Sequence, residues 1–463
     1  METTVLPNYL RSARPNPAEK RAPWYKNTAP SYTGIFLSVA FMGGMAGALA
    51  YGNLWAGFVG LLVGALFCLL LYYIPAVLGQ QTGMPLYVVG SSTFGATGGI
   101  LLPGLVMGVL QIGWHAVMTF AGASFLAQAL GLPSSGATFW VICLIWGLSL
   151  AFVGAVGVQL LGRLSSILPI FPLIMVALAA IANSKGLGGF RSAIKLPEAA
   201  AGIPLAGLGA FAALQAVAGF FATAGAAGAD FGSNSRDQED VLLGGLFGVT
   251  IAPIVIGLLA MLAMAGAVGL NPSIAANVGK QTFFVDSIMG IGGLLAKVAA
   301  WGFVLASICP TGFCALLFAN AFSTMFPSLP RMPLAMVAGL IGSLGAATGI
   351  ANNLVIFFLI IGASFGPVIG AMTAQYIRDG GWKGPRKGIN WAGYIAWAGG
   401  FLVGMIDMFP TLADQFGMPA LHTIGFTYGL STLMSYLVGL ALYLILAGVG
   451  LEPAAVDLPA GSR

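Results

Sequence analysis

SYTGIFLSVAFMGGMAGALAY, residues 31–51, is the stretch that decides the fold. It is long and apolar enough to cross the roughly 30 Å hydrocarbon core of a bilayer as one helix. Gly43, Gly44 and Gly47 nevertheless stand near its centre, and glycine disfavours helix and exposes backbone polar groups. In lipid these groups need partners, so a broken helix survives only where protein or a polar cavity receives it. The stretch therefore predicts a membrane-spanning helix that breaks at these glycines inside a larger bundle.

A second interrupted segment lies in the middle of the chain, at 208–229, where Gly225 and Gly228 fall within FFATAGAAGA. Two broken hydrophobic segments in corresponding positions are typical of secondary transporters, whose substrate lies between them near the midplane of the membrane. The sequence therefore predicts two repeats with one broken helix in each.

Composition places the whole chain in the membrane. Hydrophobic residues make up 58% of it and charged residues only 7%, whereas a soluble domain carries about 25% charged residues. Windows of roughly 20 apolar residues recur along the chain and predict an all-α membrane protein with twelve transmembrane helices. The predicted spans are 31–52, 55–78, 97–125, 137–157, 163–184, 204–229, 241–268, 291–320, 332–350, 352–376, 391–409 and 424–448.

These spans predict one transmembrane domain at 31–450, with repeat one at 31–184, repeat two at 204–376 and peripheral helices at 391–448. Residues 1–30 are polar and include Pro7, Pro15, Pro17 and Pro23, so they predict a disordered cytoplasmic tail, and 451–463 predict a second cytoplasmic tail. No cleavable signal peptide is recognisable, because no apolar core closely follows the first basic residues.

Lysine and arginine in the loops predict the orientation, because these residues accumulate on the cytoplasmic side. With the N-terminus inside, the outer set is Lys185, Arg191, Lys195 and Lys280. The inner set is Arg11, Arg14, Lys20, Arg21, Lys26, Arg163, Arg236, Arg331, Arg378, Lys383, Arg386, Lys387 and Arg463. We therefore expect a multi-pass protein of the cell inner (plasma) membrane with both termini cytoplasmic. The net charge of +5 reflects this orientation and predicts no nucleic-acid partner.

Four segments resemble one known family. They are STFGATGG at 92–99, QIGWHAV at 111–117, GFFATAGAAGADF at 219–231 and IIGASFGPVIGAMTAQYI at 360–377. Together they resemble the nucleobase–cation symporter-1 family of cytosine and purine permeases. The resemblance implies a leucine-transporter-like fold with a five-plus-five inverted repeat, in which helices 1 and 6 are broken. It also implies cation-coupled import of a small, neutral, planar nitrogen heterocycle such as a nucleobase.

The candidate substrate site centres on Gln111 and Trp114, which share one helical face because they are three residues apart. An indole can stack on a flat heteroaromatic ring, and a carboxamide can both donate to and accept from its polar edge. The resemblance implies this use of both residues. It also implies that Phe221 stacks on the other ring face or gates it, and that Thr223 supplies a hydroxyl. Phe220 replaces a serine of the family's pattern, which removes one polar contact.

Helix 8 departs from the family's pattern. The resemblance implies a sodium site formed by the carbonyls of Gly34, Leu37 and Val304 and the hydroxyl of Ser307, since sodium prefers hard oxygen ligands. Ile308 stands where relatives have a second hydroxyl. Thr311 is a possible substitute, because Pro310 frees a carbonyl and bends the helix. Cys309 stands where cytosine carriers place an amide that reads the base, so we expect Cys309 and Thr311 to face the substrate.

Other functions remain open at this point. A same-fold sodium- or proton-coupled carrier of a hydantoin- or allantoin-like compound, a vitamin or an amino acid is the main alternative. His115 is buried in an apolar helix, and an ionisable residue there is a functional candidate. A proton carried by His115 is therefore the alternative to sodium, although a neutral histidine bonded to a neighbouring helix is the simpler interpretation. Because the only histidines, His115 and His422, have no metal-binding spacing, we expect neither an enzyme nor a resident cofactor.

Overall fold

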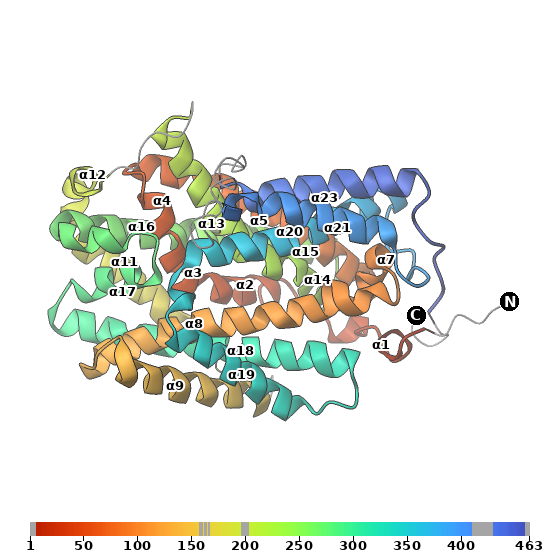
Figure 1. The fold of residues 1–463 in the computed structure, drawn as a ribbon, viewed down its shortest axis with the longest axis horizontal. Coiled ribbons are helices and arrows are strands. Elements are labelled where there is room, and N and C mark those ends of the chain that lie inside the picture. The colour runs from red at the N-terminus through yellow and green to blue at the C-terminus, as the bar shows by residue number, and fades with distance from the viewer. Residues whose placement is uncertain are drawn as a thin grey trace.

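The computed structural model describes residues 6–156, 161, 164, 167–195, 203–409 and 429–458, which fold into a bundle of helices (Figure 1). The helices that form long apolar segments are α5 (Leu54–Thr82), α8 (Val106–Leu130), α9 (Gly136–Val156), α11 with α12 (Ile170–Asn183 and Phe190–Ala193), α13 (Leu205–Ala226), α15 with α16 (Gln238–Gly244 and Ala252–Leu270), α18 (Gly293–Met325), α20 (Leu354–Asp379) and α23 (Ser431–Gly448). Two further helices are α19 (Arg331–Ala347) and α21 (Trp391–Gly404). The all-α membrane fold is thereby confirmed.

The predicted count of twelve spans is not confirmed for the described part of the chain. Nine of its helices are long and apolar enough to cross a bilayer, and a bent pair makes a tenth span. At 17 residues α19 is shorter than a typical membrane-spanning helix, and α21 has 14. Parts of the predicted fifth and twelfth spans lie outside the described residues.

Helix pairs in the bundle approach each other until their backbones touch. In Figure 1, α8, α9, α18 and α19 lie together along the lower side, with α8 packed along α18 and α9 along α19. A Cβ atom on Gly154 of α9 would lie 2.2 Å from the carbonyl oxygen of Gly312 in α18. In the same way, a Cβ on Gly60 of α5 would lie 2.0 Å from Ala210 O in α13. Small residues at helix crossings allow the close packing that holds membrane helices together.

Helix 1 is interrupted twice: its 53° bend lies before the predicted glycines, and a second interruption at Met45 directly follows Gly43 and Gly44. It consists of α2 (Thr28–Phe36), α3 (Val39–Gly44) and α4 (Ala46–Leu49), and it bends by 53° between α2 and the rest. The break falls at Ser38, which is extended and whose Oγ accepts a hydrogen bond from Phe41 N–H. A serine that supplies an N-terminal cap can start a new helix without any glycine. Gly44 instead permits close packing, since its Cβ would lie 2.3 Å from the ring of Phe358 in α20.

Helix 6 is interrupted where the sequence predicts. Helix α13 ends at Ala226, and α14 begins at Gly228 and runs to Gly232. A Cβ atom on Gly228 would lie 2.9 Å from Tyr72 O in α5. The two glycines of this segment therefore flank the interruption at Ala227, as expected.

The prediction that residues 1–30 are disordered is wrong for residues 6–30, which pack on one end of the bundle. Within α1 (Asn8–Arg11), Tyr9 donates its hydroxyl to Ala96 O at 2.7 Å, and Leu10 is fully buried. Asn16 N–H donates to Gly83 O, at the end of α5, at 2.8 Å. The prolines do not prevent order here, because the backbone finds acceptors at the ends of the long helices.

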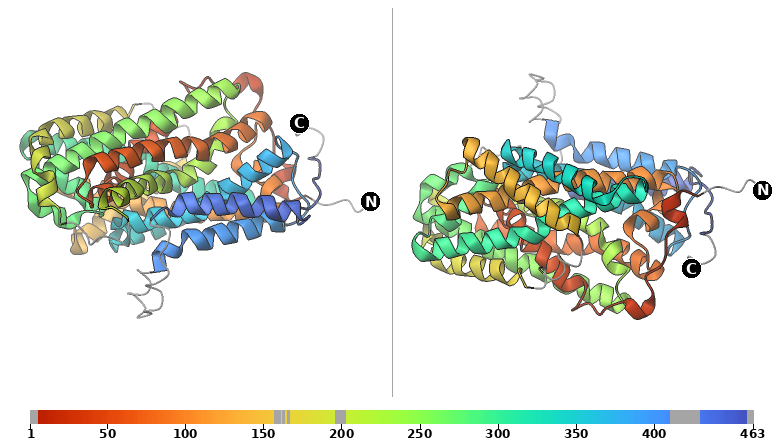
Figure 2. Two further views of the ribbon diagram at one scale, coloured as in Figure 1. Left: turned by 90° about the horizontal axis from the view of Figure 1, so that it is seen from above. Right: turned by 90° about the horizontal axis from the view of Figure 1, so that it is seen from below.

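The described C-terminal segment, which follows α23, is anchored at the same end (Figure 2). Its Glu452 lies 2.6 Å from Arg386, and Arg386 lies 2.8 Å from Asp379 at the end of α20. Both ends of the described chain therefore lie on one side of the bundle, as the predicted orientation requires.

Candidate functional site

Trp114 connects helix 3, which is α8, to helix 6, whose first part is α13, by a hydrogen bond. It lies in the first half of α8, its side chain is only 5% exposed, and its Nε1 donates to Thr223 Oγ1 of α13 at 3.1 Å. Thr223 itself is buried. Since the indole has this one polar atom, the bond fixes the direction in which its plane faces. The structure thus brings together two residues that the sequence placed in one site.

Three phenylalanine rings surround the indole. Phe220 and Phe357 approach it edge to face, with ring centroids 5.1 and 4.9 Å from it, and Phe358 lies tilted at 6.0 Å. Phe220 belongs to α13 and the other two to α20. Aromatic pairs at such distances and angles attract each other beyond the burial of their area. The space beside the indole is therefore filled by aromatic side chains in this structure.

Phe221 does not lie against Trp114, and the neighbouring Phe220 does. Phe221 stacks on Phe36 of helix 1 with centroids 5.4 Å apart and planes 11° from parallel, and it also contacts Tyr32. Consecutive residues of a helix point about 100° apart, so only one of the two phenylalanines can face α8. The loss of the family's serine at 220 therefore places an aromatic ring against the indole.

Gln111 lies one turn before Trp114 and is 6% exposed. Its Nε2 lies 3.6 Å from Met107 Sδ, which is a weak acceptor. Most of the hydrogen-bonding capacity of this carboxamide is therefore available to a ligand.

The predicted helix 8 is α18 in the structure. It carries four predicted site residues and continues through Pro310 as one helix. Ser307 donates its hydroxyl to Val304 O at 2.8 Å, and Thr311 donates its hydroxyl to Ser307 O at 2.6 Å. Cys309 is 7% exposed and the other three are more deeply buried. The hydroxyl protons of Ser307 and Thr311 are thus bonded within their own helix, which leaves their oxygen lone pairs for other partners.

The break in helix 1 affects the two predicted carbonyl ligands directly. Ser38 N–H donates to Ile35 O at 3.2 Å, and Phe41 N–H donates to Ser38 Oγ. In a continuous helix these two N–H groups would bind the carbonyl oxygens of Gly34 and Leu37. Both carbonyls therefore lose their helical donors at the break.

A family model for permeases of cytosine/purines, uracil, thiamine and allantoin matches residues 15–439. The chain belongs to this family. The predicted membership of the nucleobase–cation symporter family is thereby confirmed, and the chain is a membrane transporter. Among curated proteins, none matches the sequence of this permease.

Solved structures show the fold of the permease. It is similar to Mhp1 in an inward-facing conformation, with a TM-score of 0.69 and 16% identity over 100% of this chain and 97% of that one. Mhp1 in a closed conformation with bromovinylhydantoin bound gives 0.67 at 16% identity, over 96% and 97%. A Na⁺-coupled sialic acid symporter in a substrate-bound, outward-open state gives 0.60 at 14% identity, over 97% and 93%. The leucine-transporter-like fold predicted from the sequence is confirmed.

His115 lies apart from the Trp114 cluster of the permease. It is fully buried, its Nδ1 lies 3.3 Å from Thr119 Oγ1 of the same helix, and its ring lies where a Cβ of Gly342 in α19 would be. The ring thus faces α19 and not the space beside the indole. His422 lies outside the described residues. Among the residues that the structure describes, no group of three or more histidine, cysteine or acidic side chains could hold a metal ion.

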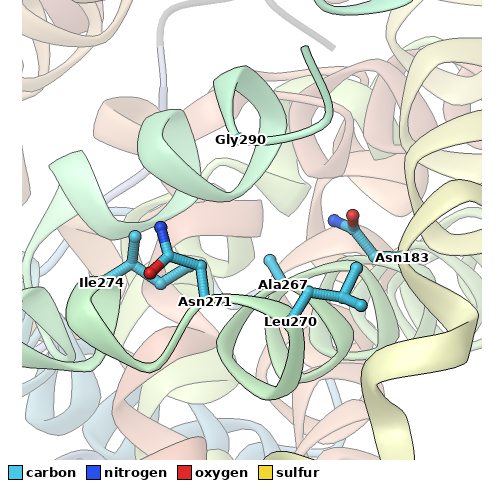
Figure 3. Close-up of a pocket in the computed structure, with 6 residues that line it drawn as sticks. All are labelled: Asn183, Ala267, Leu270, Asn271, Ile274 and Gly290. Atoms are coloured by element: carbon cyan, nitrogen blue, oxygen red, sulfur yellow. The ribbon is translucent and has the colours of Figure 1, made fainter.

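Figure 3 shows a small pocket, lined by Asn183, Ala267, Leu270, Asn271, Ile274 and Gly290. Its volume of about 30 Å³ is enough for one or two water molecules and not for a heterocycle. None of its lining residues belongs to the candidate site.

Phe357 and Phe358 are the site residues that the sequence analysis missed. No pattern in the sequence indicated them, and only the folded structure shows that glycines make room for their rings. A Cβ on Gly113, next to Trp114, would lie 2.7 Å from Phe357, and one on Gly44 would meet Phe358.

Proposed function

We propose that this permease imports a small, neutral, planar nitrogen heterocycle, such as cytosine, a purine or a related nucleobase, which stacks on Trp114. The observation that carries the proposal is the bond from Trp114 Nε1 to Thr223 Oγ1, because it holds the indole plane in a fixed direction. A rigid aromatic plane reduces the loss of freedom on binding. Gln111, one turn away, donates to and accepts from the polar edge of the ring.

The other candidate residues favour a neutral substrate. Phe220 of helix 6 lines the indole, Cys309 and Thr311 of helix 8 are the further candidates, and neither they nor Gln111 carries a charge. A charged substrate in such a buried site would need a counter-charge, because an unpaired charge in low dielectric is very unfavourable. A ring stacked on the indole displaces at least one of the phenylalanines that now surround it.

Sodium is the coupling ion that we propose. The carbonyls of Gly34 and Leu37, released by the break in helix 1, would bind it together with Val304 O and Ser307 Oγ. Carbonyl and hydroxyl oxygens suit a hard cation. Cation binding then stabilises the outward-open state, substrate binds between helices 1, 3, 6 and 8, and rocking of two helix bundles exposes it to the cytoplasm.

We further propose that the protein lies in the plasma membrane with both termini in the cytoplasm. The support is the excess of lysine and arginine in the loops on the side of the N-terminus, together with the shared location of α1 and the segment after α23 (Figure 2).

The proposal is tested by a thermal-shift screen of the purified protein against nucleobases, hydantoins, vitamins and amino acids. We expect a neutral planar heterocycle to raise the unfolding midpoint, because a ligand that binds only the folded state stabilises it. The Trp114→Phe variant, which keeps an aromatic ring but loses the bond to Thr223, should bind the same compound more weakly. A response to amino acids alone, or full affinity in Trp114→Phe, would refute the assignment.

A further inference from the structure

The N-terminal strap, residues 6–27, runs across the end of the bundle at which both ends of the described chain lie (Figure 1). Hydrogen bonds tie its second half to the ends of helix 2 (α5) and helix 6 (α14) and to the start of helix 7 (α15). These bonds are Asn16 N–H to Gly83 O (2.8 Å), Arg21 Nη1 to Gln80 O (2.8 Å), Ala22 N–H to Asn234 O (2.8 Å) and Trp24 N–H to Asp240 Oδ1 (3.0 Å). This half of the strap is therefore fixed to helices 2, 6 and 7.

The first half of the strap contacts a different set of helices. Tyr9, in α1, is 4% exposed and donates its hydroxyl to Ala96 O, just before helix 3, at 2.7 Å. A Cβ atom on Gly99 would lie 2.5 Å from the same hydroxyl oxygen, so a glycine provides the space for it. Helix α1 also lies beside α18, and its Leu10 is fully buried. This half of the strap is therefore fixed to helices 3 and 8.

The acceptor of the Tyr9 hydroxyl is attached to the loop before helix 11 (α21). Ala96 N–H donates to Arg386 O at 2.7 Å, and Tyr394 of α21 donates its hydroxyl to Gly98 O, also at 2.7 Å. The long helices divide in the same way, because α5 packs along α13 and α14, whereas α8 packs along α9 and α18. The strap thus joins two groups of helices, and Tyr9 holds it to the group that contains helix 3.

We propose that the N-terminal strap restrains the opening of the cytoplasmic side of the permease, and that the bond from Tyr9 to Ala96 fastens it. The inference rests on the proposed function, in which substrate leaves between helices 1, 3, 6 and 8 as two helix bundles rock. Moving helix 6 away from helix 3 at this end separates the surfaces to which the two halves of the strap are bound. A bond that exists only in the closed state favours that state, and one neutral hydrogen bond changes the ratio of open to closed protein about two- to tenfold.

The test measures the distance between the two groups by double electron–electron resonance in the reconstituted full-length protein. Spin labels are attached at Gln238→Cys, at the start of α15, and at Lys383→Cys, in the loop before α21, because both side chains are exposed and the native cysteines are buried. We expect Tyr9→Phe to raise the ratio of the longer to the shorter distance about two- to tenfold. Tyr394→Phe, the matched control, also removes a 2.7 Å bond, but within one group, so the ratio should stay unchanged.

Two distances in the same ratio in Tyr9→Phe and the wild type, or an equal rise in Tyr394→Phe, would overturn the inference. A merely structural role of Tyr9 would lower the unfolding midpoint and leave the ratio unchanged. Deleting residues 2–15, which removes all of α1, should raise the ratio further. A single distance in all of these proteins, in both NaCl and choline chloride, would refute the proposed rocking of two bundles. Failure of the strap and failure of the transport mechanism are therefore distinguishable.

Discussion

Replacing Thr223 by valine isolates the contact that holds the indole of Trp114. Valine has nearly the same shape as threonine but offers no acceptor, so Nε1–H is left unpaired in a site where the tryptophan is 5% exposed. A buried donor without a partner costs about 1–3 kcal/mol. We therefore expect Thr223→Val to lower the free energy of unfolding by about that amount and to weaken heterocycle binding, because the indole plane is no longer fixed.

A double-mutant cycle with Trp114→Phe separates this effect from general disturbance. Phenylalanine has no N–H, so Thr223→Val should have little effect in that background, and the coupling free energy should reach about 1 kcal/mol or more. Thr223→Ser, which keeps the hydroxyl, is the matched control. The assay is chemical unfolding in detergent, with binding of the heterocycle from the thermal-shift screen measured by tryptophan fluorescence. Equal effects of Thr223→Val in both backgrounds would refute the argument.

Three further outcomes are expected. Gln111→Leu should weaken binding most for heterocycles with an amide-like edge, because that edge then lacks a partner; an equal loss for all rings would count against a role in recognition. His115→Phe should leave the sodium dependence and the pH profile of proteoliposome uptake unchanged, since the ring faces α19; uptake that is driven by a pH gradient and lost in this variant would instead show proton coupling. Burial raises the pKa of Asp230, in α14 beyond the α13 span, to about 6, whereas the unfolded carboxyl titrates near pH 4. The folded state therefore binds more protons between these values, stability falls as pH rises from about 4 to about 6, and Asp230→Asn should remove this part of the pH dependence of unfolding.

The sequence predicted the fold class because membrane helices follow directly from hydrophobic length. The interruption of helix 6 was also predictable, since Gly225 and Gly228 flank it. The number of membrane-spanning helices was harder to predict, because α19 is short and its limits depend on tertiary packing.

The candidate site was predictable only where residues on one helix decide it. Gln111 and Trp114 share a face of α8 because of their spacing, and the helix-6 motif identified Thr223 as a partner. The choice between Phe220 and Phe221 depends on the rotation of α13, which a short motif does not determine. The rings of Phe357 and Phe358 arrive from a helix far away in the sequence, so no local pattern places them beside the indole.

The position of the break in helix 1 decides which backbone carbonyl oxygens are available to a cation. A break at Gly43 or Gly44 would leave the carbonyls of Gly34 and Leu37 inside a regular helix, bonded and unable to bind a cation. The break at Ser38 diverts the two N–H groups that would bind these carbonyls, so the serine releases the oxygen atoms. Gly43 and Gly44 have a different role, because they let α20 approach closely enough for its rings to reach Trp114. The proposed cation site and the candidate substrate site therefore depend on different residues of helix 1.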